Sequence, residues 1–388
     1  MAGERWAASG LMWLTGWPDE PPLDGPAVIA DALASVADDI AHLSGGRVAL
    51  DGPAIAGERA AIRGLSRRGR VSPGGACRLL QTVDGWIAVN LPRDSDVELL
   101  PAWLESSQAD WASSVRTRPT EELVSRASLL GLPVVVPGEC TAGPVVRRPR
   151  GAPSGGAARS IDGARVVDLS AMWAGPLCAS ILGLAGADVI KVEDPRRPDG
   201  ARSGPPEFFD LLHAGHRSVV LPLESPELRA LLARADVVIE SARPRAFEQL
   251  GIDRERTSAV WIAITGHGLD TPDRNRPAFG DDAAVAGGLV ATDPHDGGPL
   301  FCADALADPV TGLMAARAAL EALDAGGAWI IDTSLAGCAS ELRRLCPAEA
   351  GKSAKEPEPP RARAPRGTAA PMGAHTDEVL AEVGGRAA

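Results

Sequence analysis

The chain has 388 residues, of which 45% are hydrophobic, and it carries a formal net charge of −12 at pH 7. This length exceeds what a single hydrophobic core usually serves and predicts about two domains. The acidic balance excludes a general binder of nucleic acid or of anionic membranes, because both partners require a basic surface. An anionic small ligand remains compatible with it, since such a ligand needs only a local basic pocket.

The cysteines and the apolar runs bound the cellular context. No CxxC pair and no His at metal spacing accompany the six cysteines, so we expect no metal site and free thiols in a reducing, cytoplasmic setting. The start, MAGERWAASG, has an early Glu and none of the apolar core of a signal peptide. No apolar run reaches the ~18 residues of a membrane-spanning helix. The cysteines are Cys77, Cys140, Cys178, Cys302, Cys338 and Cys346.

The first 143 residues divide into two parts. Residues 1–55 begin rich in turns and continue as a helix, with Leu33, Val36, Ile40 and Leu43 at helical spacing. Residues 56–143 form an expected small domain, in which RLLQTVDGWIAVNLP reads as two strands joined at Asp84-Gly85. VELLPAWLES and EELVSRASLLG follow as helices, and LPVVVPG as a strand.

A change of pattern follows residues 144–162, which are rich in Pro, Gly and Arg and are expected to be a linker. Residues 163–345 alternate buried strands with helices, beginning with ARVVDLS, GPLCASILGLAGA and DVIKVED. This β-α-β order predicts a doubly wound parallel sheet, an α/β fold. Residues 346–369 are expected to be a flexible linker, and residues 370–388 to carry a C-terminal helix that returns to the large domain.

Nucleotide-binding fingerprints are missing from the sequence. The first strand-to-helix turn, LSAMWAGPL, is not G-x-G-x-x-G, and no G-x-x-x-x-G-K-[ST] occurs, so we expect no nucleotide cofactor. The helix that begins at Gly175-Pro176 would still attract phosphate, although Gly-Pro is equally an ordinary helix start.

Polar and charged side chains flank the predicted strands of the large domain. Ligands of open α/β sheets bind beyond the carboxyl ends of the strands, so a polyanion there would meet several cations. A solvated loop explains any single Arg equally well, and a loop His is more often structural. The side chains are Lys191, Asp194, Arg196, Arg197, Arg202, His216, Arg217, Ser241, Arg243, Thr265 and His267.

The order of these segments resembles CoA-transferase family III, the group of carnitine CoA-transferase, formyl-CoA transferase and α-methylacyl-CoA racemase. Three stretches carry the resemblance over about residues 163–345: VVDLSAMWAGPLCASILGLAGADVIKVEDPRRPDGAR, FFDLLHAGHRSVVLPLESPELRALLARADVVIESARPRAFEQLG and WIAITGHGLDTPDRNRPAFGDDAAVAGGL. RRGRVSPGGACRLLQTVDGWIAVNLP resembles the family's small domain with its glycine loop, and PMGAHTDEVLAEVG resembles its C-terminal end.

The resemblance implies a Rossmann-like large domain, a smaller α+β domain, and acyl-CoA bound as a substrate. Gly74 and Gly75 form the implied glycine loop, shorter than in the family. Ser241-Ala242 stands where the family more often has Asn-Phe, which weakens individual assignments. The implied CoA contacts are Trp173, Ala174, Lys191, Asp194, Arg202, Arg217, Ser241, Arg243, Thr265 and His267.

The small domain stands first here, whereas in the family it follows the catalytic-aspartate helix. The chain is therefore interpreted as permuted, or as rebuilt from a fused duplication. Residues 20–46 resemble a degenerate copy of residues 298–323. Their sequences are EPPLDGPAVIADALASVADDIAHLSGG and GPLFCADALADPVTGLMAARAALEAL, and the alignment places Asp31 over Asp308. Residues 1–55 would then be a partial repeat of the catalytic-aspartate element, with Asp31 a structural remnant.

Asp308 has two interpretations. Asp followed by Pro309 is a common helix start, with Asp as N-cap, and the local string alone favours that role. The resemblance assigns to Asp308 the family's catalytic aspartate. A carboxylate at a helix N-terminus is stabilised as an anion and can act as a nucleophile. Gly312, one turn on, would allow a thioester or a backbone to approach closely.

The sequence therefore predicts a CoA-transferase that moves CoA from an acyl-CoA to a carboxylic acid through aspartyl anhydride and aspartyl-CoA intermediates. One alternative is an acyl-CoA racemase or epimerase; the region of that branch's GHD reads FGDDAAV here, with Asp281 in place of His. A second is a non-catalytic subunit of a transferase complex. The resemblance implies an interlocked homodimer or a hetero-oligomer with a related subunit.

Overall fold

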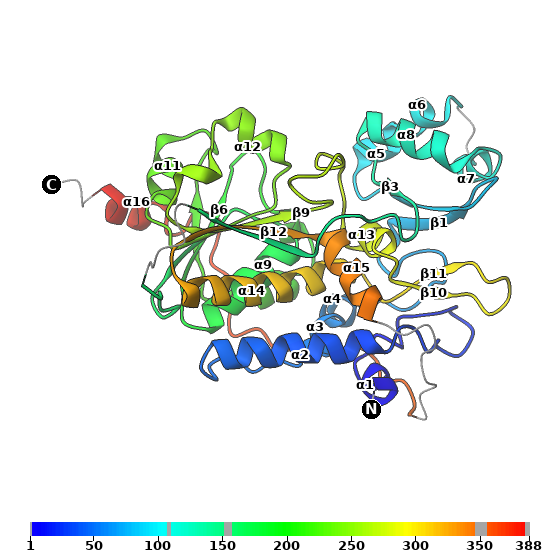
Figure 1. Cartoon of the computed structure of the whole chain (residues 1–388), viewed down its shortest axis with the longest axis horizontal. Coiled ribbons are helices and arrows are strands. Elements are labelled where there is room, and N and C mark those ends of the chain that lie inside the picture. The colour runs from blue at the N-terminus through cyan, green and yellow to red at the C-terminus, as the bar shows by residue number, and fades with distance from the viewer. Residues whose placement is uncertain (1, 107–109, 151–156, 346–354, 385–388) are drawn as a thin grey trace.

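The protein is described by a computed structural model that covers residues 2–106, 110–150, 157–345 and 355–384. Figure 1 shows a large sheet with helices on both faces, a smaller sheet capped by helices, and the long helix α2 along the base. Within the part of the chain that the structure describes, no helix is long and apolar enough to cross a lipid bilayer.

The large sheet is doubly wound, as predicted. Its parallel strands lie in the spatial order β7-β6-β5-β8-β9-β12, which is the 3-2-1-4-5-6 arrangement of two β-α-β halves. The order reverses between β5 and β8, and this switch point is where such sheets bind ligands. The strands are β5 (Arg165–Asp168), β6 (Asp188–Glu193), β7 (Arg217–Val220), β8 (Val237–Glu240), β9 (Val260–Thr265) and β12 (Ala328–Ser334).

Alternate residues of these strands enter two different cores. Val166, Val189 and Ile262 face one core, whereas their neighbours Val167 and Ile190 face the other. Burial of both faces explains why the strands read as continuous apolar runs. The first core holds α9 (Ala174–Leu184), α13 (Gly280–Ala286), α14 (Ala307–Ala325) and α15 (Leu335–Leu345). The second holds α11 (Pro226–Leu232), α12 (Pro244–Leu250) and α16 (Thr376–Gly384).

The segment expected as a linker over residues 144–162 contains a strand. Val145–Arg150 form β4, which pairs antiparallel with β12 and becomes the edge of the large sheet. The Pro and Arg content that suggested a linker fits an edge strand, because Pro149 removes only one donor there and the charges discourage further pairing. Residues 151–156 of that segment lie outside the described residues.

The second expected linker, residues 346–369, is described from residue 355 onward and follows a fixed path. The Glu358 N–H donates to the Ala7 carbonyl at 2.9 Å, and Arg363 binds the buried Glu58 carboxylate through two nitrogens. The chain then reaches α16, where Glu382 accepts a hydrogen bond from Arg217 at 2.7 Å. These contacts tie residues 355–369 to the rest of the protein, while residues 346–354 lie outside the described part.

The small sheet follows the predicted hairpin. β1 (Cys77–Gln81) and β2 (Trp86–Asn90) pair antiparallel around Asp84-Gly85, and β3 (Val134–Val135) adds to β2. The single helix expected over VELLPAWLES is two helices, because Pro101 lacks the N–H that a continuous helix would require. The helices beside this sheet are α5 (Asp94–Glu98), α6 (Leu100–Leu104), α7 (Trp111–Val115) and α8 (Thr120–Leu130).

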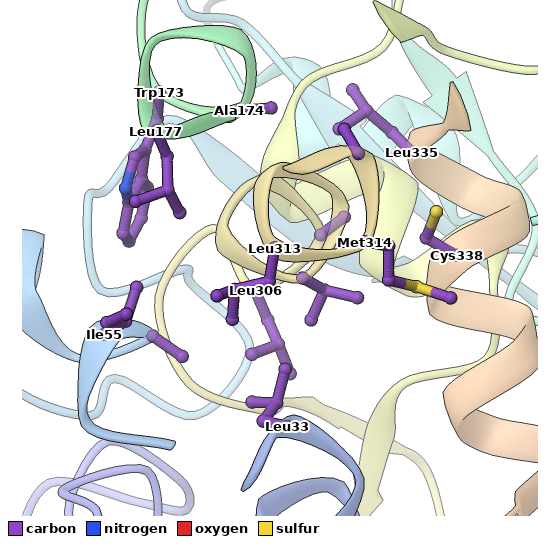
Figure 2. Packing of buried hydrophobic residues seen from close by; sticks show 14 of the residues in the cluster. Leu33, Ile55, Trp173, Ala174, Leu177, Leu306, Leu313, Met314, Leu335 and Cys338 are labelled. Carbon is purple, nitrogen blue, oxygen red and sulfur yellow. The ribbon is translucent and has the colours of Figure 1, made fainter. Parts of the chain in front are cut away.

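Helix α14 lies at the centre of the larger core. It packs against α9, α15 and α2 (Val28–Leu43), so all its sides meet protein. Figure 2 looks along α14 and shows Leu33 of α2 below Leu306, with Cys338 of α15 to one side. Gly312 is the closest point to α9, where an added Cβ would lie 2.7 Å from the Ala174 carbonyl oxygen. This glycine therefore serves helix packing.

The N-terminal segment completes the shell around α14. It contributes α1 (Ala2–Ala8), α3 (Gly52–Ile55) and α4 (Glu58–Arg63) besides α2. A hairpin that the sequence did not predict, β10 (Val290–Thr292) with β11 (Pro299–Phe301), leads into the loop before α14. The first residues of the chain are therefore close to the helix that carries Asp308.

We predict that Leu33→Ala lowers the free energy of unfolding by about 2–5 kcal/mol, the usual cost of a buried Leu-to-Ala change. Leu33 is fully buried between α2 and its neighbours. Urea unfolding measures the loss. Leu129→Ala, at a position that is 87% exposed, is the matched control and should change stability by less than about 0.5 kcal/mol. Equal, small losses in both variants would contradict the packing of α2 on α14.

Candidate functional site

Asp308 is the second residue of α14, and the helix begins at Ala307 with Leu306 in the N-cap position. The expected N-cap role of Asp308 is therefore wrong, although the carboxylate still lies in the first turn. The backbone N–H of Gly280, at the start of α13, hydrogen-bonds the Asp308 carboxylate. An added Cβ at Gly280 would overlap Asp308 Oδ2, so the approach of α13 requires this glycine.

Three charged side chains surround Asp308: Arg59 of α4, Asp304 of the preceding loop and Asp281 of α13. Arg59 binds Asp304 with two parallel hydrogen bonds, from Nε at 2.8 Å and from Nη2 at 2.7 Å. Asp281 accepts the Ala305 N–H at 2.8 Å. We call Arg59, Asp281, Asp304 and Asp308 the carboxylate cluster.

Burial and like charge act together on the carboxyl groups of Asp281 and Asp308. Burial, with the nearby Asp281 and Asp304, raises the pKa of Asp308 to about 7, while Arg59 and the Gly280 N–H act in the opposite direction. Burial and Asp304 raise the pKa of Asp281 to about 6. Asp308 is nevertheless only partly covered as a residue, and its carboxyl group ionises near neutral pH.

The cluster lies near the switch point of the large sheet. Gly312 touches Ala174 at the start of α9, which follows β5, so the first turns of α14 and α9 are neighbours. Ser241, after β8, accepts the Ala171 N–H at 3.2 Å and joins the ends of β8 and β5. Met172 stands in this turn with φ of 74° and is 46% exposed. A strained, exposed residue at a switch point is typical of a ligand site.

Arg243, at the start of α12, differs from the other expected cationic contacts because other positively charged side chains surround it. Burial and the positive charges of Arg93, Arg245 and Arg197 lower the pKa of its guanidinium. Among the described residues, no ion pair of Arg243 is found; Arg93 pairs with Asp96, which partly offsets the charge, so positive charge remains in excess around Arg243. Such a cluster favours an anion.

Lys191 lies inside the protein. Its side chain is 1% exposed, and its ammonium group lies 2.9 Å from Asp199 Oδ2 and 3.5 Å from Asp168 Oδ2. It also donates to the Ser170 carbonyl, while Asp199 accepts the Met172 N–H. A CoA contact for Lys191 stays a prediction; in the structure its ammonium group is buried and paired, and it holds the turn after β5.

Asp194, Arg202 and Arg217 are likewise engaged within the protein. Asp194 accepts several hydrogen bonds from Arg196, which together with backbone donors hold its pKa far below the ordinary value. Arg202 binds Glu193 through Nε and Nη2. Arg217 pairs with Asp188 and with Glu382 of α16. A CoA phosphate would have to displace these partners.

The other expected contacts are buried. Thr265 donates to Asp332 at 2.8 Å, and His267 lies inside the protein, where burial and Arg276 lower its pKa to about 4. Trp173 is buried under Arg59, whose guanidinium carbon lies 5.7 Å from the indole centre. Ala174 meets Gly312 through its carbonyl. Trp173 and Ala174 therefore lie next to the cluster, whereas Thr265 and His267 make contacts elsewhere in the protein.

The glycine loop lies beside the carboxylate cluster. An added Cβ at Gly74 would lie 3.2 Å from Arg59 Nη2 and 3.6 Å from Asp304 Oδ1. Gly75 has φ of 88°, a conformation that favours glycine. Loop and α4 thus reach the cluster together. Asp31 lies elsewhere, in a surface pair with Arg5 at 2.6 Å.

Sequence reasoning missed Arg59 and Asp304. Arg59 sits in GERAA, a stretch with no distinguishing motif, and Asp304 was visible only as a second Asp before Asp308.

Two further findings stand apart from the cluster. In the described ranges no group of His, Cys, Asp and Glu has metal-binding geometry. A cavity of about 810 Å³ lies beside α11 and α12, and its arginines are already engaged: Arg148, Arg254 and Arg274 have acidic partners, and Arg229 donates to backbone carbonyls.

Asp282, next to Asp281, joins the two domains. It is fully buried and its Oδ1 accepts a hydrogen bond from Asn90 Nδ2 of β2 at 2.6 Å. Asp282 Oδ2 and Asn90 Oδ1 both lack a donor. Burial raises the pKa of Asp282 to about 8. A protonated Asp282 would supply the missing donor and close a two-hydrogen-bond ring with the amide.

The sequence was compared with protein families. Residues 161–377 match the sequence pattern of CoA-transferase family III. This range includes β5–β9, β12, α14 and the start of α16, and therefore Asp308, Asp281 and Arg243.

Individual relatives are also CoA-transferases by name. The chain is 32% identical over 182 residues to succinyl-CoA–D-citramalate CoA-transferase of Chloroflexus aurantiacus, covering 42% of this chain and 45% of that protein. It is 35% identical over 179 residues to the beta subunit of succinyl-CoA–L-malate CoA-transferase of the same organism, covering 42% and 44%. The match spans less than half the length of these relatives.

A solved structure of a CaiB/BaiF family protein from Brucella suis aligns with 28% sequence identity and a TM-score of 0.44, covering 50% of this chain and 59% of that one.

We predict that Asp282 makes stability depend on pH. A carboxyl group whose pKa is raised by folding, here from 3.8 to about 8, stabilises the fold at low pH, and this contribution is lost as pH rises toward 8. In Asp282→Asn, the amide supplies the missing donor at every pH. Relative to this variant, the wild type should lose up to about 1.4 kcal/mol per pH unit between roughly pH 5 and 7.

Urea unfolding of both proteins across that pH range measures the difference. Asp19→Asn, at an exposed position, is the control and should keep the wild-type dependence. Identical slopes for the wild type and Asp282→Asn would show that Asp282 is not protonated in the folded protein.

Proposed function

Because the chain belongs to CoA-transferase family III, we propose that it transfers CoA from an acyl-CoA thioester to a carboxylic acid with Asp308 as the nucleophile. One observation carries the proposal. Asp308 is a partly accessible residue in the first turn of a buried helix, near the switch point of a doubly wound sheet. A carboxylate is the group that this exchange requires, because it can be acylated and released.

The proposed steps conserve the thioester. The Asp308 carboxylate attacks the acyl carbonyl of the donor and expels CoA thiolate, leaving an aspartyl anhydride. The thiolate then attacks the Asp308 carbonyl and releases the donor acid, which leaves an aspartyl-CoA thioester. The acceptor carboxylate repeats both steps in reverse. The Gly280 N–H is in place to hold one Asp308 oxygen during this exchange.

Within this proposal, CoA binds as a substrate at the switch point. Arg243, with Arg197 and Arg245 near it, would receive the phosphates, since their positive charge is not balanced by the protein. Ser241 lies at the same edge. Lys191, Asp194, Arg202 and Arg217 would act on the shape of the site, because each is already paired.

The racemase alternative receives less support. Proton transfer by a His–Asp pair would require a His among the groups around Asp308. The charged groups that act on Asp308 are Arg59, Asp281 and Asp304. His267, the candidate upstream, is influenced by Arg276 and Asp273 instead.

Assembly and location are also proposals. The relative named as a beta subunit supports a hetero-oligomer, and the family resemblance supports an interlocked homodimer. Arg59 acts on Asp308 of the same chain and Gly74 lies beside Arg59 and Asp304, so one chain supplies both sides of the carboxylate cluster. The free thiols of Cys77, Cys178 and Cys338 suit a reducing compartment such as the cytoplasm.

We predict that Asp308→Asn lowers kcat for CoA exchange by at least about 10³-fold, because the amide cannot be acylated in the same way. The assay is a panel of acyl-CoA donors and free acids that includes succinyl-CoA. Hydroxylamine added with a donor should inactivate the wild type and leave a hydroxamate on the peptide that contains Asp308.

Asp31→Asn is the matched control, since Asp31 lies in the stretch interpreted as a copy of the Asp308 element and forms a surface pair with Arg5. It should retain wild-type exchange. Full activity of a purified complex that carries Asp308→Asn would favour the non-catalytic subunit.

A further inference from the structure

The loop that leads into α14 is strained. Ala303 has φ of 60° and Ala305 has φ of 44°, in the left-handed region that side chains other than glycine rarely adopt. Among the described residues, four non-glycine residues have positive φ, and three of them are Ala303, Ala305 and Met172 at the candidate site. Strain of about 1–3 kcal/mol per residue persists only where the surroundings fix the backbone.

Three side chains fix this loop. Thr15 Oγ1 accepts the Ala303 N–H at 3.2 Å, and Asp281 Oδ1 accepts the Ala305 N–H at 2.8 Å. Between them, Arg59 binds both oxygens of Asp304, which is fully buried. Thr15 and Arg59 come from the N-terminal segment, far from the loop in sequence. Residues from the first 63 positions of the chain therefore hold the backbone next to Asp308, with Thr15 inside and Arg59 just beyond the stretch interpreted as a remnant.

Arg59 is itself held on several sides. Nε and Nη2 are engaged by Asp304, the Trp173 ring lies 5.7 Å from the guanidinium carbon, and Gly74 lies against Nη2. These contacts leave Arg59 poorly placed to bind a substrate carboxylate. They leave its positive charge inside the cluster, where it faces Asp308.

We propose that Arg59 is a positioning residue for Asp308: its ion pair with Asp304 fixes the strained loop, and its charge opposes that of Asp281 to keep the Asp308 carboxylate ionised. The described groups that act on Asp308 are Arg59 from α4, Asp304 from the loop, and Asp281 with the Gly280 N–H from α13. Cys77, which is influenced by Asp281, stays neutral because burial raises the pKa of its thiol well above the ordinary value. The catalytic meaning of this arrangement rests on the proposed function, whereas the ionisation of Asp308 does not.

The direct consequence is a set of opposite shifts in the titration of Asp308. Asp281→Asn removes a neighbouring negative charge and should lower the pKa of Asp308. Asp304→Asn should also lower it, because Arg59 loses its competing partner. Adding Arg59→Gln to Asp304→Asn removes the remaining positive charge and should raise the pKa above the wild-type value, by about one pH unit or more. A merely structural role would not give shifts of both signs.

Arg59→Gln alone is a poor test, because it would leave the buried Asp304 without a partner and could unfold the protein. The double variant avoids this, since two amides replace the ion pair. Arg63→Gln is the control, at an exposed position of the same helix α4, and should leave the titration of Asp308 unchanged.

The experiment follows the carboxyl carbon of Asp308 by NMR in protein labelled with ¹³C-aspartate, as pH is varied. Asp308→Asn identifies the resonance by its loss. We expect the pKa of Asp308 to be lowest in Asp304→Asn, higher in the wild type and highest in the double variant. The acid limb of the pH profile of kcat/KM for CoA exchange should shift in the same order. Equal pKa values in Asp304→Asn and the double variant would overturn the inference, even in a protein without transferase activity. Correct shifts without exchange would instead overturn the proposed function alone.

Discussion

Helix α14 is packed between other helices, and this constraint organises the rest of the molecule. α9 and α15 cover two sides of the helix, and the N-terminal segment covers the third with α2. Burial makes the Asp308 carboxyl group costly to ionise, so the same elements that enclose it have to supply compensation. The Gly280 N–H and Arg59 provide it, one from the large domain and one from the N-terminal segment. Packing and chemistry therefore depend on the same contacts.

The two ends of the site have opposite electrostatic character. Around Asp308, acidic side chains outnumber basic ones, and the carboxyl groups of Asp281 and Asp308 ionise only near neutral pH. At the start of α12, positive charge exceeds negative charge around Arg243. An acyl-CoA has matching ends, with phosphates at one and an uncharged thioester at the other. In the proposed function, the cationic end would bind the phosphates while the thioester meets a carboxylate whose charge is protected from neighbouring anions.

The sequence predicted those parts of the fold that follow from local patterns. Apolar runs such as DVIKVED, separated by helices, led to the doubly wound sheet, and Asp84-Gly85 led to the hairpin. Lys191 shows where local patterns end: its position after a strand suggested a ligand contact, but Asp168 and Asp199 hold it inside the protein. Arg59 could not be predicted, because its importance comes from a contact with Asp304 far along the chain. Likewise, the Arg-rich residues 145–150 revealed a strand only through pairing with β12.

The central claim is that Asp308 forms and breaks covalent bonds to substrate during CoA transfer. It is tested most directly by transfer of oxygen from an acceptor acid labelled in both carboxylate oxygens with ¹⁸O. Passage through an anhydride leaves one acceptor oxygen on the protein, so peptide mass spectrometry after turnover should find ¹⁸O in the peptide that contains Asp308 and in no other. CoA transfer that proceeds while this peptide stays unlabelled would contradict the account.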